Sequence, residues 1–533
     1  MALSGLRDIS ERPSPVVLAV LDGWGISPSS ANPVASANPP SFEYLWRNYP
    51  RAVLQSYKLL ENPQGEVGSV EIGHVSIGTG RVVQDDLADL DLAISSGQFF
   101  NNDILRQVFV QAKKESKAVH LLGLLSDGGI HASFDHLNAL IELAKKESAP
   151  RVWVHAFLDG EDVPSNTAMS YLNQLKTILD ENIQLATVIG RKFAMDRTDN
   201  WNLTKRAYQA LVSDTAQVVN WSNLERRLVN ELESQIEPLV IAEEAKQVRP
   251  GRIRPGDYVV FWNFRGERLW QVIRAMIDPE ALKNLGLYRS VPISSVEKIV
   301  TLTDYKLPFN KIEIAFPSAQ IENNLGQLLS ANQFTQLRIA ESEKASHITL
   351  YFNGGNTEPY KGEERLIIPS PKINKSYAEQ PVMAAGQITR ALERAITGRT
   401  HDFILVNFAN LDMVARSKDL AATKIAILAI DEALRRVANA CLKVGGALLV
   451  TADHGTNRLG LNKKKISISP LPFIYISGAN KKSVPESDLT ENSIARALKS
   501  KHTLADVAPT VLELFGIPKP SDMTGASLLN NLE

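Results

Sequence analysis

Seven short apolar runs, each ending in polar or charged residues, constrain the fold of this chain more than any other feature. The runs are rich in β-branched residues, and continuous apolar segments of this length suit strands buried on both faces of a parallel sheet. Because helical segments lie between them, the sequence predicts an α/β fold. The strands are expected within residues 15–25, 118–131, 151–163, 184–197, 257–268, 402–413 and 447–455.

Three of the intervening segments, residues 105–116, 134–147 and 423–446, are predicted to be helices. The last has apolar residues at helical spacing and ends in Gly445 and Gly446. Glycine commonly ends helices, so this pair is expected to form the C-cap.

The residues that follow the apolar runs are aspartate, histidine and arginine in run after run. In open α/β sheets, ligands gather at the carboxyl ends of the strands, so this pattern predicts a pocket there. The alternative is that charged residues follow strands only because loops are polar. The residues concerned are Asp22, Asp127, His131, Asp159, Asp162, Arg191, Arg197, Arg265, Arg268, Asp412, Asp453 and His454.

Length and charge limit the classes of protein that need consideration. The chain has 533 residues, which is more than one compact core usually holds, so two or more domains are expected. Lys and Arg total 58 against 59 Asp and Glu, a formal net charge of -1. No global field therefore favours nucleic acid or an acidic membrane surface as a partner.

The cysteine content and the N-terminal segment both favour a cytoplasmic protein. Cys441 is the single cysteine, so no intrachain disulfide can form, which fits a reducing compartment. A signal peptide requires an apolar run, and none precedes Pro15. The run VVLAVL that follows is too short to span a bilayer.

Ten motifs occur in one order along nearly the whole chain: DGWG, GEVGSVEIGHVSIGTGR, LLSDGGIHAS, HAFLDGEDV, GRKFAMDR, FWNFRGER, AESEKASHITLYFNGG, NFANLDMV, TADHG and LADVAPTVLELFGIP. In this order they resemble the 2,3-bisphosphoglycerate-independent phosphoglycerate mutases of the alkaline-phosphatase superfamily. The resemblance implies a glycolytic isomerase that interconverts 3-phosphoglycerate and 2-phosphoglycerate. It also implies a serine nucleophile between two divalent metal ions, usually manganese, and a monomer.

The same resemblance implies two α/β domains. Residues 1–84 and 319–533 would form the phosphatase-like domain that holds metal, and residues 85–318 would form an inserted substrate-binding transferase domain. Pro- and Gly-rich breaks near Asp85 and Pro317 agree with these seams.

Part of the family's metal cage is retained. Asp22, Asp453 and His454 match the ligands of one metal, and carboxylates with imidazole suit manganese. Asp412 matches a ligand of the second metal. The alternative for the three matching ligands is a hydrogen-bonded role at the edge of the core.

The substrate side of the family's site is also largely retained. His131 matches a phosphate-contacting histidine, Asp162 a proton-transferring aspartate, and Lys344 a lysine near the transferred phosphoryl group. The arginines that match the family's anion clamp, whose forks suit phosphate and carboxylate, are Arg191, Arg197, Arg265 and Arg268. Alternatively, nearby acids such as Glu267 neutralise these arginines.

The family's nucleophile is missing. Its G-N-S-E-V-G-H segment aligns without a gap to residues 68–74, which puts Val70 at the serine position. Valine has no nucleophilic atom, so no phosphoenzyme can form there. Ser69 is adjacent but, on an extended chain, points to the opposite face unless a one-residue bulge intervenes.

Three further replacements fall on the same site. Arg416 and Ile466 stand where the second metal has histidine ligands, and arginine cannot ligate a cation. Glu161 stands where a substrate-clamping arginine is expected, which puts a negative charge beside an anionic substrate. Arg416 lies four residues after Asp412 and would neutralise it if that segment is helical.

We therefore expect a mutase-family protein that has lost mutase activity and acts by binding. We expect one divalent ion at most, Mn²⁺ or a similar metal, and a small phosphorylated metabolite or an unidentified protein as partner. Two alternatives stay open. One is an active mutase that uses Ser69, and the other is a phosphatase in which a metal-bound water attacks directly.

Overall fold

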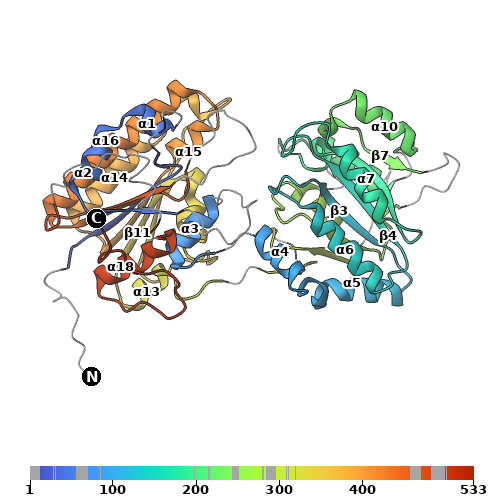
Figure 1. Ribbon diagram of the computed structural model, residues 1–533, viewed down its shortest axis with the longest axis horizontal. Coiled ribbons are helices and arrows are strands. Elements are labelled where there is room, and N and C mark those ends of the chain that lie inside the picture. Colours follow the sequence, from blue (N-terminus) through green and yellow to red (C-terminus); the bar gives the residue numbers. More distant parts are fainter. Residues whose placement is uncertain are drawn as a thin grey trace. The chain divides into compact units, whose positions relative to one another are not determined.

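The computed structural model describes residues 12–532 except 28, 30–31, 56–69, 84–85, 197, 214–215, 243–250, 279–280, 282, 284–295, 308, 310, 318–319, 456–469, 482–498 and 500. The chain divides into two compact units (Figure 1). The first consists of Met1–Asp85 and Ala319–Glu533, and the second, Asp86–Ser318, is inserted between them.

The first unit is built on one seven-stranded sheet with β1 at its centre. Five neighbouring strands run parallel, β15 is antiparallel to β14, and β2 is antiparallel to β15. Every residue of β1 is buried, as the continuous apolar run predicts. The order is β12 (Glu363–Ile368), β11 (Gln336–Glu341), β13 (Phe403–Phe408), β1 (Val16–Leu21), β14 (Ala447–Thr451), β15 (Leu471–Ile476) and β2 (Arg51–Leu54).

Helices cover the sheet of the first unit in two groups (Figure 1). One group is α1 (Pro33–Ala37), α2 (Pro40–Asn48), α14 (Ala385–Gly398), α15 (Asn410–Ala415) and α16 (Leu420–Val444). The other is α3 (Val70–Thr79), α13 (Leu325–Ala331) and α18 (Val507–Phe515). The short 3₁₀ helices η4 (Ser342–Lys344), η6 (Tyr377–Glu379) and η7 (Leu504–Asp506) and the π-helix η5 (His347–Tyr351) complete the described elements of this unit.

The second unit has an eight-stranded sheet in which six strands run parallel. Strand β7 is antiparallel to β5, and β6 is parallel to β7. The order is β10 (Ile312–Ile314), β9 (Lys298–Thr301), β8 (Tyr258–Phe261), β3 (Val119–Leu125), β4 (Val152–Leu158), β5 (Ile183–Gly190), β7 (Leu239–Ile241) and β6 (Gln217–Val219).

The connections of this second sheet create a switch point between β3 and β8. From β3 the chain proceeds to β4 and β5 in one direction, and from β8 it proceeds to β9 and β10 in the other. Right-handed crossovers then place α6 and α11 on opposite faces of the sheet. Its helices are α4 (Asp86–Ser95), α5 (Asp103–Lys114), α6 (Phe134–Lys146), α7 (Ala168–Ile178), α8 (Arg191–Ala194), α9 (Trp201–Val212), α10 (Trp221–Asn230) and α11 (Trp270–Ile277), with turns η2 (Phe99–Asn101) and η3 (Glu233–Gln235).

The predicted α/β fold, the seven strands and the three helices are confirmed. Helix α16 begins with an Asp419 side chain that accepts from the Ala422 N–H, and it ends at Gly445 with a φ of 72°. Both ends follow ordinary capping chemistry. Among the described helices, none combines the length and apolarity needed to cross a bilayer.

One local expectation is wrong. Val70 was expected on an extended segment, where the neighbouring side chain points to the opposite face, but α3 begins at Val70. Successive side chains on a helix are turned by about 100° rather than 180°. The predicted direction of the Ser69 side chain falls on a residue outside the described part of the chain.

Candidate functional site

The carboxyl ends of four parallel strands in the first unit bring together the residues that the sequence singles out. Asp22 follows β1, Asp453 follows β14, Asp412 lies in α15 just after β13, and Lys344 closes the turn after β11. All four are buried. Their convergence follows from the parallel arrangement, since such strands end at one edge of the sheet.

Lys344 lies between two of these carboxylates. Its Nζ is 2.7 Å from Asp22 Oδ2 and 2.9 Å from Asp412 Oδ2, and its side chain is 1% exposed. Burial alone would lower the pKa of Lys344, but the field of Asp22, Asp412 and Asp453 raises it above its usual range. The lysine is therefore a fixed cation inside the cluster.

Arg416 supplies a second fixed cation. Helix α15 spans Asn410–Ala415 with Arg416 at its C-cap, and the Arg416 Nη2 lies 2.5 Å from Asp412 Oδ2. The pair has the four-residue spacing that the sequence pointed to. Asp412 Oδ2 thus accepts from Lys344 and Arg416 together.

His454 faces the opposite oxygens of the same carboxylates. Its Nε2 is 3.2 Å from Asp22 Oδ1 and 3.9 Å from Asp412 Oδ1. Burial opposes protonation, but Asp453, Asp22 and Asp412 raise the pKa of His454 to about 10. For Asp22 the effect of burial has the opposite sign, since burial would raise the pKa of a carboxyl group. Lys344, His454 and His74 nevertheless hold the pKa of Asp22 well below its usual range.

His74 is a member of the cluster that the sequence reasoning missed. It lies on α3, with Nδ1 3.3 Å from Asp453 Oδ2 and Nε2 3.1 Å from the side-chain nitrogen of Asn407. The glycine that precedes it in the sequence, Gly73, could have indicated a close helix contact here. In the structure, a Cβ on Gly73 would come within 2.4 Å of the Asp453 carbonyl oxygen. That glycine allows α3 to pack directly against Asp453.

The described residues provide two sets of side chains that can hold a metal ion. The expected set was Asp22, Asp453 and His454, but the structure pairs these residues differently. One set is Asp22, His74 and Asp453, and the other is Asp22, Asp412 and His454. The first set has the carboxylate and imidazole donors that a divalent ion needs. Protein cations already contact a carboxylate in each set, because Lys344 pairs with Asp22 and both Lys344 and Arg416 pair with Asp412.

In the second unit, candidate residues meet at the switch point between β3 and β8. The backbone N–H groups of Phe264 and Arg265 both donate to the carbonyl of His131, which joins the two strand ends. His131 Nδ1 is 2.7 Å from Asp162 Oδ2, and its Nε2 is 3.3 Å from Glu267 Oε1. Burial would lower the pKa of His131, but these two carboxylates raise it.

Arg191 forms ion pairs with two neighbouring aspartates. Its Nη1 is 2.5 Å from Asp159 Oδ1 and 2.9 Å from Asp162 Oδ1, with a side chain that is 2% exposed. Glu161, the residue that replaces a clamping arginine, has its Oε2 3.8 Å from Arg191 Nε. Asp159 is further held by the Ser126 hydroxyl. This arginine is neutralised within its own unit, as the alternative reading of the clamp foresaw.

Two of the other clamp candidates lie among the described residues. Arg265 and Arg268 are half-buried, and Arg265 is among the groups that hold the pKa of Glu267 down against its burial. Arg197 and Ile466 lie outside the described residues, and of Val70 only the backbone is described.

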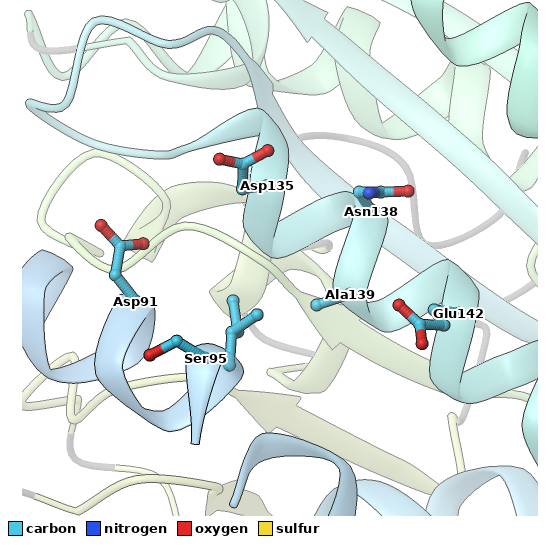
Figure 2. Close-up of a pocket in the computed structure, with 7 residues that line it drawn as sticks. Asp91, Ser95, Asp135, Asn138, Ala139 and Glu142 are labelled. Carbon is cyan, nitrogen blue, oxygen red and sulfur yellow. The ribbon is translucent and has the colours of Figure 1, made fainter. Parts of the chain in front are cut away.

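A separate groove on the second unit holds none of the predicted site residues. It lies between α4 and α6, has a volume of about 220 Å³, and is lined by acidic and small polar side chains together with the apolar Ile94 and Ala139 (Figure 2). Asp91 at its edge accepts a hydrogen bond from His136 Nε2 at 3.0 Å. The residues that Figure 2 labels are Asp91, Ser95, Asp135, Asn138, Ala139 and Glu142.

The two sheets and the carboxylate-histidine cluster at the strand ends define a class, the α/β proteins of the alkaline-phosphatase type. The family described as "BPG-independent PGAM N-terminus" matches residues 90–307. The chain belongs to the 2,3-bisphosphoglycerate-independent phosphoglycerate mutase family, because relatives of that name match nearly its full length.

The relative from Clostridium botulinum is 36% identical over 528 residues, which cover 97% of this chain and 99% of the relative. The relative from Symbiobacterium thermophilum is 38% identical over 530 residues, covering 97% and 98%. Among solved structures, the phosphoglycerate mutase of Leishmania mexicana, studied at low cobalt concentration, aligns with a TM-score of 0.72 at 25% identity. That alignment covers 97% of this chain and 98% of the other.

Proposed function

We propose that this chain keeps the frame of its family but does not interconvert 3-phosphoglycerate and 2-phosphoglycerate at an enzymatic rate. The observation that carries the proposal is that Lys344 and Arg416 both donate to Asp412 Oδ2. Asp412 matches a ligand of the second metal, and two fixed cations now share one of its carboxylate oxygens.

The chemistry explains why this matters. A serine becomes a nucleophile near neutral pH only when a metal or a base removes its proton, and a phosphoryl group in transfer needs concentrated positive charge. When bound, divalent ions would supply that charge and lower the pKa of the hydroxyl. Here Lys344 and Arg416 neutralise carboxylates permanently, and Val70 stands at the nucleophile position. These residues stabilise the cluster without providing a group that accepts phosphate.

The remaining role is binding. We propose that the second unit binds a small phosphorylated metabolite through Arg265 and Arg268, with the Asp162–His131–Glu267 array beside them. Arg191 contributes little, because Asp159 and Asp162 already neutralise it. We further propose a monomer in the cytoplasm, since the family resemblance implies a monomer and the single cysteine fits a reducing compartment.

An assay coupled to enolase tests the loss of turnover. The full chain is supplied with 3-phosphoglycerate and Mn²⁺, and the Clostridium botulinum relative serves as the positive control. No rate above background is expected from this chain. Turnover at an ordinary enzymatic rate, with a median near 10 s⁻¹, would overturn the proposal.

Two variants separate the missing nucleophile from the missing metal ligands. Val70→Ser alone is expected to remain inactive, because Arg416 and Ile466 still replace two metal ligands. The triple variant Val70→Ser, Arg416→His, Ile466→His restores both and is expected to bind more Mn²⁺ than the single variant. Activity recovered by Val70→Ser alone would contradict the argument from the metal cage.

A second candidate function is a metal-dependent phosphoryl hydrolase. It is favoured by the set Asp22, His74 and Asp453, three buried side chains whose carboxylate and imidazole atoms lie close enough together to hold one ion. When bound there, a metal ion would activate water without a serine. Hydrolysis of simple phosphate esters that disappears with a chelator would support this candidate, and its absence across such esters would exclude it.

A further inference from the structure

We propose that the candidate site of the second unit takes a phosphomonoester that carries an ammonium group, and that Glu161 is the residue that selects it. This rests on the proposed function, in which Arg265 and Arg268 bind the phosphate group, and adds the chemical class of the rest of the ligand. The selecting element is the turn of residues 159–162, which directly follows β4.

The first observation is that Asp159 already accepts the hydrogen bonds that this turn can donate. Asp159 is buried, and its Oδ1 accepts from the backbone N–H groups of Glu161 and Asp162, both at 3.0 Å. The Ser126 hydroxyl donates to its Oδ2 at 2.6 Å. Successive backbone N–H groups in a turn often bind an external anion, but here an aspartate of the protein takes that place. These two N–H groups are therefore not available to an acid group of a ligand.

The second observation is that Arg191 is also withheld from an external anion. Its Nη1 is 2.5 Å from Asp159 Oδ1 and 2.9 Å from Asp162 Oδ1, and its side chain is buried. Arginine binds a phosphate or carboxylate best when its planar fork faces the ligand. Because two carboxylates of the protein share one nitrogen of this fork, Arg191 stabilises the turn rather than a bound acid.

Glu161 is the member of the turn that a ligand can reach. Its side chain is 46% exposed, and its Oε2 lies 3.8 Å from Arg191 Nε, near the outer limit for an ion pair. An ionised carboxylate only accepts hydrogen bonds, so it matches a group that donates them. An ammonium group supplies three donors and the opposite charge, whereas a carboxylate of the ligand would be repelled.

The charge balance around the turn favours a cation as well. A continuous series of contacts joins five side chains, in the order Glu267, His131, Asp162, Arg191 and Glu161. With Asp159, which also contacts Arg191, the series has four carboxylates against one guanidinium and one imidazole. These contacts leave two uncompensated negative charges when His131 is protonated and three when it is neutral. An ammonium group near Glu161 reduces this excess.

The opposite end of the series carries the cations that suit a phosphate group. Arg265 and Arg268 follow β8 on either side of Glu267, and both are half-buried. Burial would raise the pKa of Glu267, but His131 and Arg265 are among the groups that hold it below its usual range. The site thus has a cationic side for phosphate and an anionic side for the remainder of the ligand. A phosphomonoester with an ammonium group matches both sides.

O-phospho-L-serine and 3-phosphoglycerate are matched probes, because they differ only by an ammonium group in place of a hydroxyl group. Calorimetry on the full chain is expected to give O-phospho-L-serine a Kd about fivefold lower, as a partly exposed ion pair at the upper end of the usual range would. A third probe, 2-aminoethyl phosphate, lacks the carboxylate and is expected to bind at least as tightly as O-phospho-L-serine.

Substitutions at Glu161 test its role without disturbing a buried group. Glu161→Gln is expected to remove the preference for the ammonium probe, and Glu161→Arg is expected to reverse it. Glu313→Gln is the matched control, because Glu313 on β10 is 42% exposed and also contacts a cation, Lys298 Nζ, at 2.8 Å. The control is expected to keep the wild-type preference. Arg268→Met is expected to weaken the binding of all three probes.

The outcomes separate this inference from the function on which it rests. Equal Kd values for the matched probes, or a lower Kd for 3-phosphoglycerate, would overturn the ammonium preference and leave the phosphate site standing. A preference that persists in Glu161→Gln would overturn Glu161 as the selecting residue. If no probe binds, or if Arg268→Met binds all three as the wild type does, the proposed phosphate site fails and the inference fails with it.

Discussion

The ammonium group of Lys344 lies 2.7 Å from Asp22 Oδ2, inside the carboxylate cluster at the carboxyl edge of the first sheet. The same nitrogen is 2.9 Å from Asp412 Oδ2. A side chain of the protein thus bridges two carboxylates that match ligands of different metals in the family. The cluster is stabilised by its own cations, and this arrangement leads to the first prediction.

Replacing Lys344 by methionine is expected to destabilise the first unit and to make it dependent on metal. Removing one partner of a buried ion pair typically costs about 3–5 kcal/mol, because the remaining charge stays buried. Added Mn²⁺ is expected to recover part of the lost stability, since a ligand that binds only the folded state stabilises it. Thermal unfolding with chelator and with Mn²⁺ measures both effects.

Lys306→Met is the matched control. Lys306 pairs with Asp304 at 2.6 Å, but its side chain is 58% exposed, and exposed pairs contribute about 0–1 kcal/mol. Equal unfolding temperatures for the two variants would contradict the bridging role of Lys344.

Gly73→Ala is expected to displace α3 from Asp453. The added Cβ would lie 2.4 Å from a backbone oxygen, which cannot move aside as a flexible side chain can. We expect a loss of roughly 1–3 kcal/mol in unfolding free energy, as overpacking usually costs, together with weaker Mn²⁺ binding. Gly386→Ala on α14 is the control, because its nearest neighbour would be Arg390 Nη1 at 3.7 Å. A Gly73→Ala chain as stable as that control would show that α3 does not need this close approach.

A buried hydrogen-bonded chain crosses four strands or strand ends of the second sheet. His120 Nε2 is 3.2 Å from Asp257 Oδ2, His120 Nδ1 is 2.9 Å from His155 Nε2, and His155 Nδ1 is 2.9 Å from Thr187 Oγ1. Since the Asp257 carboxylate accepts, His120 Nε2 donates. The neutral chain then closes in one direction, with His155 donating to His120 and Thr187 donating to His155.

This chain predicts that the second unit loses stability in acid. Burial, together with His120 and Arg252, holds the pKa of His155 well below the unfolded value of 6.5. The unfolded state therefore binds more protons, so this contribution to stability is complete above that value and declines as the pH falls below it. Urea unfolding from neutral pH to about pH 5 is expected to show the decline.

His155→Gln provides the comparison for the pH dependence, because it removes one titrating ring and keeps a polar side chain. It is expected to be less stable at neutral pH but to lose less stability on acidification. A wild-type and variant chain with the same slope against pH would mean that other groups cause the acid sensitivity.

Arg191→Met is expected to destabilise the second unit by about 3–5 kcal/mol, because Asp159 and Asp162 would lose their buried cation. Arg106→Met removes a comparable arginine from a pair with Glu147, but that arginine is 45% exposed and its loss should cost much less. Urea unfolding of both variants checks the difference. An Arg191→Met chain of wild-type stability would show that the arginine is available to bind an external anion.

Much of this arrangement could be predicted from local pattern. The apolar runs predicted strands such as β1 and β14, since a buried parallel strand needs no polar alternation. The ion pair between Asp412 and Arg416 followed from a four-residue spacing, because helical geometry brings such residues together. Val70 shows the limit of the same reasoning, since the short segment around it did not reveal that a helix begins there.

The sequence by itself determined the family frame, the strand ends that carry charged residues, and the loss of a serine and two histidines from the aligned motifs. Only the tertiary structure decided which cation meets which carboxylate. Lys344 lies between Asp22 and Asp412, and His74 rather than His454 faces Asp453 Oδ2. These pairings join residues that are far apart in the chain, so no sequence spacing predicts them. They depend on how far each side chain reaches and on how closely the glycines let the backbone approach.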